Sequence, residues 1–313
     1  MKKLVPLAFL PLVSFSGGSF ALEALPDEAL SAMTGQAGVT IELDTFVTFD
    51  ALTYTDTDTG GAVQIGGVVI GGGAIAGGPG DSRLDNLKIE IDVSAEGNLV
   101  LHHESIDMIG MLNGSNGTDF GLHVDYVDVL GMNAVSTLAS DINIAGVIGP
   151  GDLIVFNDNA NGFINTQNYF EIKNGSLNID VMGVGVSNLR IFQDDNPFTS
   201  ATYTDKDGVE VSKWTDWTTD VQVDVDGNGT FDVSAAQYAA DNGNDQMVFS
   251  AITVGTASSA DGLVSDALYF RSDSAVLDMS MYVGIGNASQ NNLGYIELQN
   301  IDITGTEMIV YGH

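Results

Sequence analysis

Oxygen-bearing side chains recur at alternate positions of one short acidic stretch. They fill loop positions 1, 3, 5, 7 and 9, with glycine at position 6, as in the first three quarters of an EF-hand calcium loop; the residues are Asp224, Asp226, Asn228, Thr230 and Asp232. Calcium binds where several carboxylate and carbonyl oxygens converge. The spacing therefore predicts a Ca2+ site.

The last position of that loop departs from the pattern. An EF-hand closes with a bidentate acid at position 12, where this chain has Ala235. A site here would need another ligand, such as Asp241, Asp245 or a water molecule, and would be weak. An acidic Asx turn that joins two strands without a metal is the equally favoured alternative.

No other residues have the spacing of a reaction centre. His102 and His103 are adjacent and would point to opposite faces of a strand, while His123 and His313 lie far away. The sequence contains no His-Glu-x-x-His, Gly-x-Ser-x-Gly, phosphate loop or cysteine. We expect a protein that is not an enzyme and has no catalytic or cofactor-binding residues.

The numbers of charged and hydrophobic residues limit the kinds of binding partner that we expect. The formal net charge is −33 at pH 7, which repels nucleic acid and anionic lipid headgroups. Only 16% of the residues are charged and 44% are hydrophobic, a balance that can fill a core. We therefore expect a folded acidic protein whose partners are other proteins of the cell envelope or further copies of itself, and not nucleic acid.

The first residues have the pattern of a secretory leader. Lys2 and Lys3 precede an apolar run from Leu4 to Phe15, and small residues flank Phe20 at the expected cleavage point after Ala21. The apolar run is too short and too interrupted by proline to span a bilayer, and we expect no transmembrane helix. The leader predicts export to the periplasm, the outer-membrane surface or the extracellular space.

Apolar and polar residues alternate along most of the mature sequence. Period-two alternation marks residues 39–43, 87–93, 177–181 and 277–285 as half-buried strands. We predict an all-β protein with an elongated solenoid-like or layered fold and one short N-terminal helix. A compact β-sandwich is the alternative.

The alternation breaks phase at three similar places. The pattern apolar, polar, Asn, apolar, any, Ile occurs around Asn86, Asn188 and Asn300. Two residues separate apolar positions where a regular strand has one, so the strand must bend or bulge there. Asparagine tolerates the left-handed conformation that such a corner requires.

Composition divides the chain into consecutive parts. The glycine-rich stretch at 61–80 predicts a loop or a flat hairpin, and an Asp- and Trp-rich insertion interrupts the later strands. The predicted parts are a signal peptide at 1–21, a short helix with a glycine-containing break at 22–38, a β domain at 39–193, the insertion at 194–246 and the end of the β domain at 247–313.

The start of the mature chain is similar to a known family. The stretch "LEALPDEALSAMTGQAGVTIEL" directly after the leader resembles the N-terminus of a family of secreted Gram-negative proteins, some of which are labelled Fil-type pilus-associated proteins. The specific match covers residues 21–43. The resemblance implies a role at the cell surface or on a filament, and it brings no catalytic residues.

Two functions follow as expectations. The first is an exported, non-enzymatic protein of the cell envelope or surface, structural or adhesive and pilus-associated. The alternative is a calcium-dependent binding module for a glycan or an envelope partner.

Overall fold

The computed structural model describes much of the chain after residue 37. The described residues are 38–56, 58, 60–78, 80–94, 97–105, 118–131, 134–157, 164–193, 202–204, 208–212, 222–223, 233–234, 246–258, 267–288 and 292–311. They belong to one compact unit, residues 38–313. The predicted signal peptide and N-terminal helix lie outside the described residues.

Strands make up nearly all of the regular structure in the described residues, which confirms the all-β prediction. The main sheet has 13 strands: β1 (Val39–Thr45), β2 (Val47–Thr55), β3 (Ala62–Gly71), β4 (Leu84–Val93), β5 (Leu99–Ser105), β6 (Thr118–Leu130), β7 (Val135–Val155), β8 (Ile164–Ile179), β9 (Val184–Phe192), β14 (Val248–Ala257), β15 (Ala267–Ile285), β16 (Gly294–Asp302) and β17 (Glu307–Val310). One 3-10 turn, η1 (Gly73–Ala76), follows β3.

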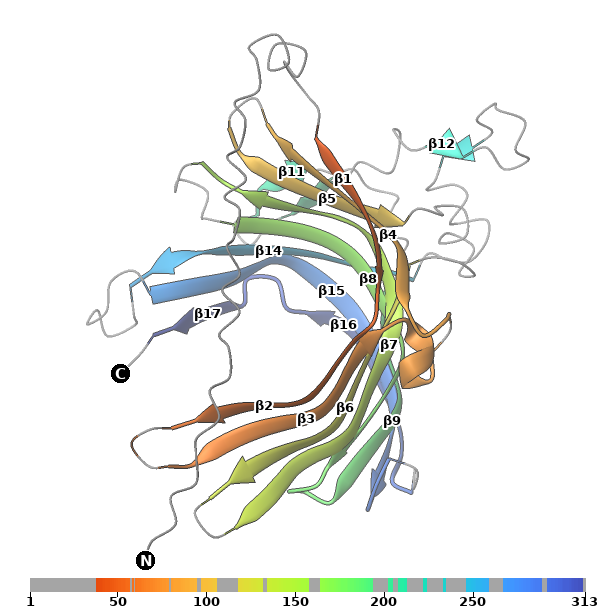
Figure 1. Ribbon diagram of the computed structural model, residues 1–313. Helices are drawn as coiled ribbons and strands as arrows, with labels where there is room; N and C mark the ends of the chain where they lie inside the picture. The colour runs from red at the N-terminus through yellow and green to blue at the C-terminus, as the bar shows by residue number, and fades with distance from the viewer. Residues whose placement is uncertain are drawn as a thin grey trace, which may run out of the picture. The chain divides into compact units, whose positions relative to one another are not determined.

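The main sheet has two halves, which three long strands connect. β7, β8 and β15 run through both halves, and the sheet bends where they pass from one to the other (Figure 1). The first half-sheet has the order β1-β4-β5-β7-β8-β14-β15-β17. The second half-sheet has the order β2-β3-β6-β7-β8-β9-β15-β16. All of these pairings are antiparallel, so of the forms expected from the sequence the layered sheet is the one present.

The three predicted corners are β-bulges in left-handed conformation. Asn86, Asn188 and Asn300 have φ angles of 57°, 49° and 53°. Each coincides with a shift of register, as where Leu277 pairs with Ile301 but Met279 pairs with Leu298. The extra residue bends the strand and increases its twist, so the prediction of a bulge at each asparagine is confirmed.

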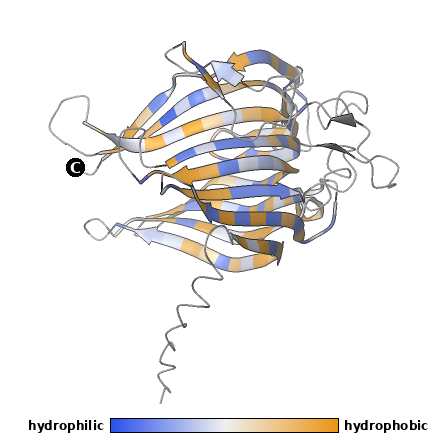
Figure 2. Ribbon diagram, turned by 90° about the horizontal axis from the view of Figure 1, so that it is seen from above, coloured by the Kyte–Doolittle hydropathy of each residue, from blue (hydrophilic) through white to orange (hydrophobic). Residues whose placement is uncertain are grey.

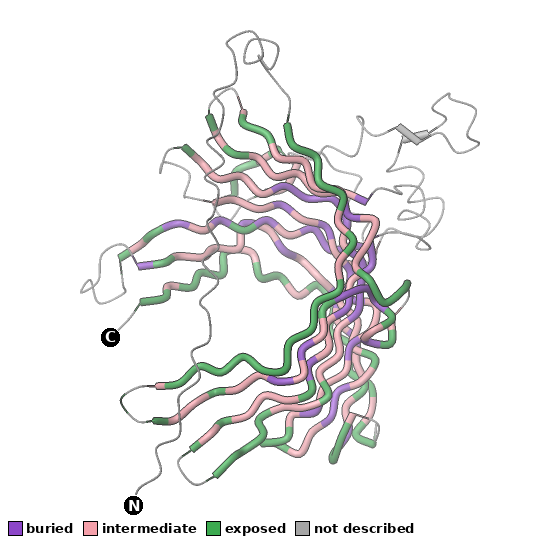
Figure 3. Tube along the Cα trace, in the orientation of Figure 1, coloured by how far each residue is buried: buried purple, intermediate pink, exposed green. Residues whose placement is uncertain are grey.

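The buried residues concentrate in the central strands. Figure 3 shows them along the bend of the sheet, whereas β2 is exposed over its whole length. At the centre, the ring centroids of Tyr169 on β8 and Phe249 on β14 lie 5.1 Å apart. Val248 and Ala251 of β14 are fully buried beside them. Apolar packing between central strands therefore forms the core.

Residues that face each other across antiparallel strands share a face of the sheet, which gives the two faces different chemistry. One row of partners is Val39, Ile91, Leu101 and Leu153, all apolar. The next row is Thr40, Glu90, His102 and Asp152, all polar. Figure 2 shows the resulting alternation along the strands. We call the two sides the apolar face and the polar face.

Part of the glycine-rich stretch is a central strand of the second half-sheet. β3 pairs with β2 on one side and β6 on the other, so residues 62–71 form a single strand of the sheet rather than a loop or a hairpin within 61–80. In the turn that follows, the N–H of Gly73 donates a hydrogen bond to the carboxylate of Asp119. A Cβ on Gly80, whose φ is +92°, would lie 2.2 Å from that carboxylate carbon. The glycines allow backbone and carboxylate to approach closely.

The region predicted as an insertion lies between β9 and β14 in the sequence. The N–H of Gln193 donates to the carbonyl oxygen of Gln246 at 3.0 Å, so this region leaves and rejoins the sheet at one place. Its described strands form two separate two-stranded sheets: β10 (Thr202–Thr204) with β11 (Glu210–Ser212), and β12 (Gln222–Val223) with β13 (Val233–Ser234). The ring of Tyr203 packs 5.3 Å from that of Phe249.

Candidate functional site

The predicted calcium ligands lie outside the described residues. They are Asp224, Asp226, Asn228, Thr230 and Asp232. The strands on either side, β12 and β13, pair antiparallel through Gln222 with Ser234 and Val223 with Val233. A calcium loop and an Asx turn would both be flanked in this way, so both remain predictions.

His102 and His103 lie on β5 and His123 lies on β6, so the described histidines belong to two strands. His102 pairs with Glu90 and Asp152 on the polar face, whereas His103 pairs with Ile89 on the apolar face, as expected for neighbours on a strand. Within the described residues, no three His, Asp or Glu side chains are grouped as metal ligands would be.

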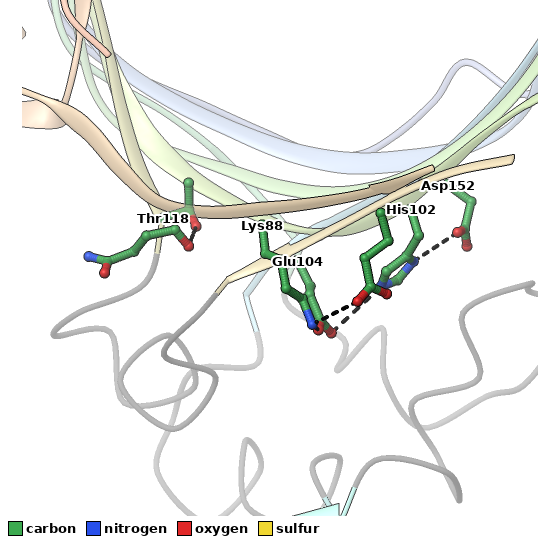
Figure 4. A network of polar contacts seen from close by, with 7 residues as sticks. Lys88, His102, Glu104, Thr118 and Asp152 are labelled. Carbon is green, nitrogen blue, oxygen red and sulfur yellow. Dashed lines mark hydrogen bonds and ion pairs between the residues drawn. The ribbon is translucent and has the colours of Figure 1, made fainter. Parts of the chain in front are cut away.

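Four side chains form a row of charges across β4, β5 and β7, which we call the polar ladder. His102 Nδ1 donates to Asp152 Oδ1 at 2.8 Å, and His102 Nε2 lies 3.6 Å from Glu104 Oε2. Lys88 forms an ion pair with the other oxygen of Glu104 and lies 3.3 Å from Glu90 Oε1. Figure 4 shows Lys88, Glu104, His102 and Asp152 in this order.

The ladder fixes the charge of its members. Burial opposes the charge of His102, but hydrogen bonds and attraction from Asp152 and Glu104 outweigh it and raise its pKa to about 9. The hydrogen bond from His102, against the effect of burial and with help from Lys88, lowers the pKa of Glu104 to about 2. On the opposite face, burial and the charge of His102 lower the pKa of His103.

A charged imidazole has no free lone pair. At neutral pH both ring nitrogens of His102 carry protons, so it can neither accept a proton from a substrate nor bind a metal. The ladder instead provides cross-strand attraction between three strands.

Two arginines of the polar face also pair with acidic groups, one across strands and one along a single strand. Arg190 of β9 donates to Glu171 of β8 at 3.1 Å and to Gln246 at 3.0 Å. Arg271 forms an ion pair with Asp273 at 2.6 Å in β15. In these contacts, arginines of the polar face pair with acidic groups of the same chain.

The two edges of the sheet differ from this paired interior. The first edge is β1 with β2, residues 39–55, and the second edge is β16 with β17, residues 294–310. Within the described part of the chain, each of these strands pairs on one side only. Their outward N–H and C=O groups can therefore accept another extended chain.

Apolar side chains lie exposed along both edges. On the first edge Leu52 is 60% and Tyr54 74% exposed, and on the second edge Tyr295 is 53% exposed and Leu298 is also exposed. Exposed apolar groups next to unpaired backbone favour addition of a strand. We regard the two edges as the candidate interaction site. The alternation in 39–43 predicted a strand, but only its position in the sheet identifies it as an edge.

No helix in the described residues is long and apolar enough to cross a membrane.

The comparison with known proteins gives a family match for the beginning of the chain. No curated protein matches it, and no solved structure matches it either. Residues 1–95, which include the first edge and β3 and β4, match the model of a family of unknown function, DUF6160.

Proposed function

We propose that this chain is an exported, non-enzymatic protein of the cell envelope or surface that acts structurally or adhesively, in association with pili. The observation that carries the proposal is the pair of long exposed edges, whose strands pair on one side only within the described residues. Such edges bind extended protein segments through backbone hydrogen bonds.

Three further features support this proposal. Charges on the polar face are held in cross-strand contacts such as the polar ladder, where they stabilise the sheet. Lys2, Lys3 and the apolar run after them have the pattern of a secretory leader. The start of the mature chain resembles secreted proteins, some of them labelled as pilus-associated.

Cell fractionation with surface labelling tests the location. We expect the mature chain in the envelope fraction and accessible to antibody on intact cells. A Leu7→Arg variant is the matched control, because a charge in the apolar run should block export and retain the protein in the cytoplasm. Equal retention of both proteins in the cytoplasm would remove the proposal.

The alternative is a calcium-dependent binding module, which the spacing from Asp224 to Asp232 favours. Here the thermal unfolding midpoint should rise on titration with calcium. The rise should be lost in the variant with both Asp224→Ala and Asp226→Ala, while magnesium at the same concentration should have little effect. A midpoint independent of calcium would exclude this alternative.

A further inference from the structure

The two edges run in opposite directions. Each half-sheet contains eight strands in the described residues, and every neighbouring pair is antiparallel. Because direction alternates and the number is even, the last strand points opposite to the first. β17 is therefore antiparallel to β1, and β16 is antiparallel to β2.

This arrangement allows the pattern to continue into a second copy of the chain. If a second molecule is placed beside the first in the same orientation, the second edge of one meets the first edge of the other. β17 then lies beside β1 and β16 beside β2, and both pairs are antiparallel. Two copies can thus continue both half-sheets with the strand alternation unbroken.

The edges also match in length and in the position of their break. β2 and β16 each contain nine residues. Each edge is interrupted once between the half-sheets, at Phe46 on the first edge and at 303–306 on the second. A straight strand could pair with only one half at a time, whereas the edge of a second copy carries the corresponding bend.

We infer that copies of this chain assemble head to tail, with the first edge of one molecule paired to the second edge of the next. The inference rests on the proposed function and names the partner of its edges as a second copy. Leu52 and Tyr54 of one copy would contact residues of β16 such as Tyr295 in the next. An unlike-edge contact of this kind generates a ring or an open filament.

Charge opposes the contact and gives a way to test it. Asp50 on the first edge and Glu297 on the second edge are both acidic. Like charges on adjacent strands repel, and salt screens the repulsion. We therefore expect the purified mature protein to associate more strongly in high salt than in low salt.

Charge reversal on one edge distinguishes the possible contacts. In sedimentation velocity at low salt, Asp50→Lys and Glu297→Lys should each tighten self-association about two- to fivefold, because each creates an opposite-charge pair across the contact. The double variant should return to the wild-type level, because both edges are then basic. Circular dichroism and the unfolding midpoint of each variant check that the fold is intact.

Three results would overturn the inference. One is a protein that stays monomeric at high salt and in both single variants. The second is tightening only when Asp50→Lys protein is mixed with wild type, which would indicate that two first edges pair with each other. The third is equal tightening in the double variant. None of these results affects the location measured by fractionation, so failure of the assembly and failure of the proposed function are distinguishable.

Discussion

Two tyrosines of the main sheet have opposite surroundings. Tyr169 on β8 is 2% exposed and packs against Phe249, whereas Tyr54 on β2 is 74% exposed. Both lie in antiparallel strands. Tyr169 packs on Phe249, which also contacts Tyr203 of the neighbouring small sheet, whereas β2 lies at the margin of the sheet with one strand neighbour among the described residues. The central strands therefore provide stability, and the edge strands leave surface for contacts.

Truncation of the two rings should give the largest contrast. We expect Tyr169→Ala to lower the free energy of unfolding by about 3–5 kcal/mol, because it leaves a cavity in the core. Tyr54→Ala should change it by less than about 0.5 kcal/mol. Urea denaturation measures both values. Equal losses would show that the edge is covered and that the comparison is wrong.

The bulges allow an interior strand and an edge strand to be compared through the cost of a strained backbone conformation. Asn188→Val places a β-branched residue at positive φ in β9, which pairs on both sides, and should cost about 1–3 kcal/mol. Asn300→Val on the edge strand β16 should cost less, because that strand can relax away from its single neighbour. The matched glycine variants should remain close to wild type. A greater loss at Asn300 would contradict this expectation.

The polar ladder predicts a dependence of stability on pH. His102 has an ordinary pKa of 6.5 and about 9 when folded, so its contribution is complete below pH 6.5 and is lost as the pH rises through about 9. Glu104 has an ordinary pKa of 4.5 and about 2 when folded, so its contribution is present above pH 4.5 and is lost as the pH falls through about 2.

Denaturation of wild type and His102→Gln between pH 6 and pH 10 tests the first part. The stability difference between the two proteins should shrink with rising pH, since other titrating groups contribute similarly to both. A difference that does not vary with pH would show that folding does not shift the pKa of His102.

The smallest difference in the free energy of unfolding should be the one between removal of an exposed ion pair and removal of a partly buried one. Arg83, next to β4, pairs with Asp44 of the first edge, and both side chains are more than half exposed. Arg83→Gln should therefore change the free energy of unfolding by less than about 0.5 kcal/mol. Arg190→Gln should cost about 1 kcal/mol, because it removes a partner from the largely buried Glu171. Urea denaturation at low and high salt separates the two. A larger and more salt-sensitive loss for Arg83→Gln would reverse the expected order.

Much of the local structure could be predicted from neighbouring residues. The alternation at 87–93 and 277–285 predicted strands, and the asparagines at 86, 188 and 300 predicted bulges, because both follow from the period of two and from residue-specific backbone preferences. Asp141 also has a positive φ, of 50°, but it interrupts no repeated pattern and could not be singled out.

Neither the polar ladder nor the position of the two edges could be predicted in the same way. Lys88, His102 and Asp152 meet because β5 lies between β4 and β7, and this order depends on contacts between residues far apart in the sequence. Whether the strand at 47–55 is central or an edge depends on the same order. Strand patterns give the face of each residue but not the neighbours of each strand.

The sequence by itself determined the all-β class, the alternation of apolar and polar sides and the places where strands bend, because these depend on the two-residue period and on the conformations open to each residue. Only the tertiary structure decided which strands are central, which charges meet in the polar ladder and which backbones remain as edges. Pairing between distant strands sets these features, since antiparallel strands of similar composition can pair in many orders and the packing of the whole sheet selects one.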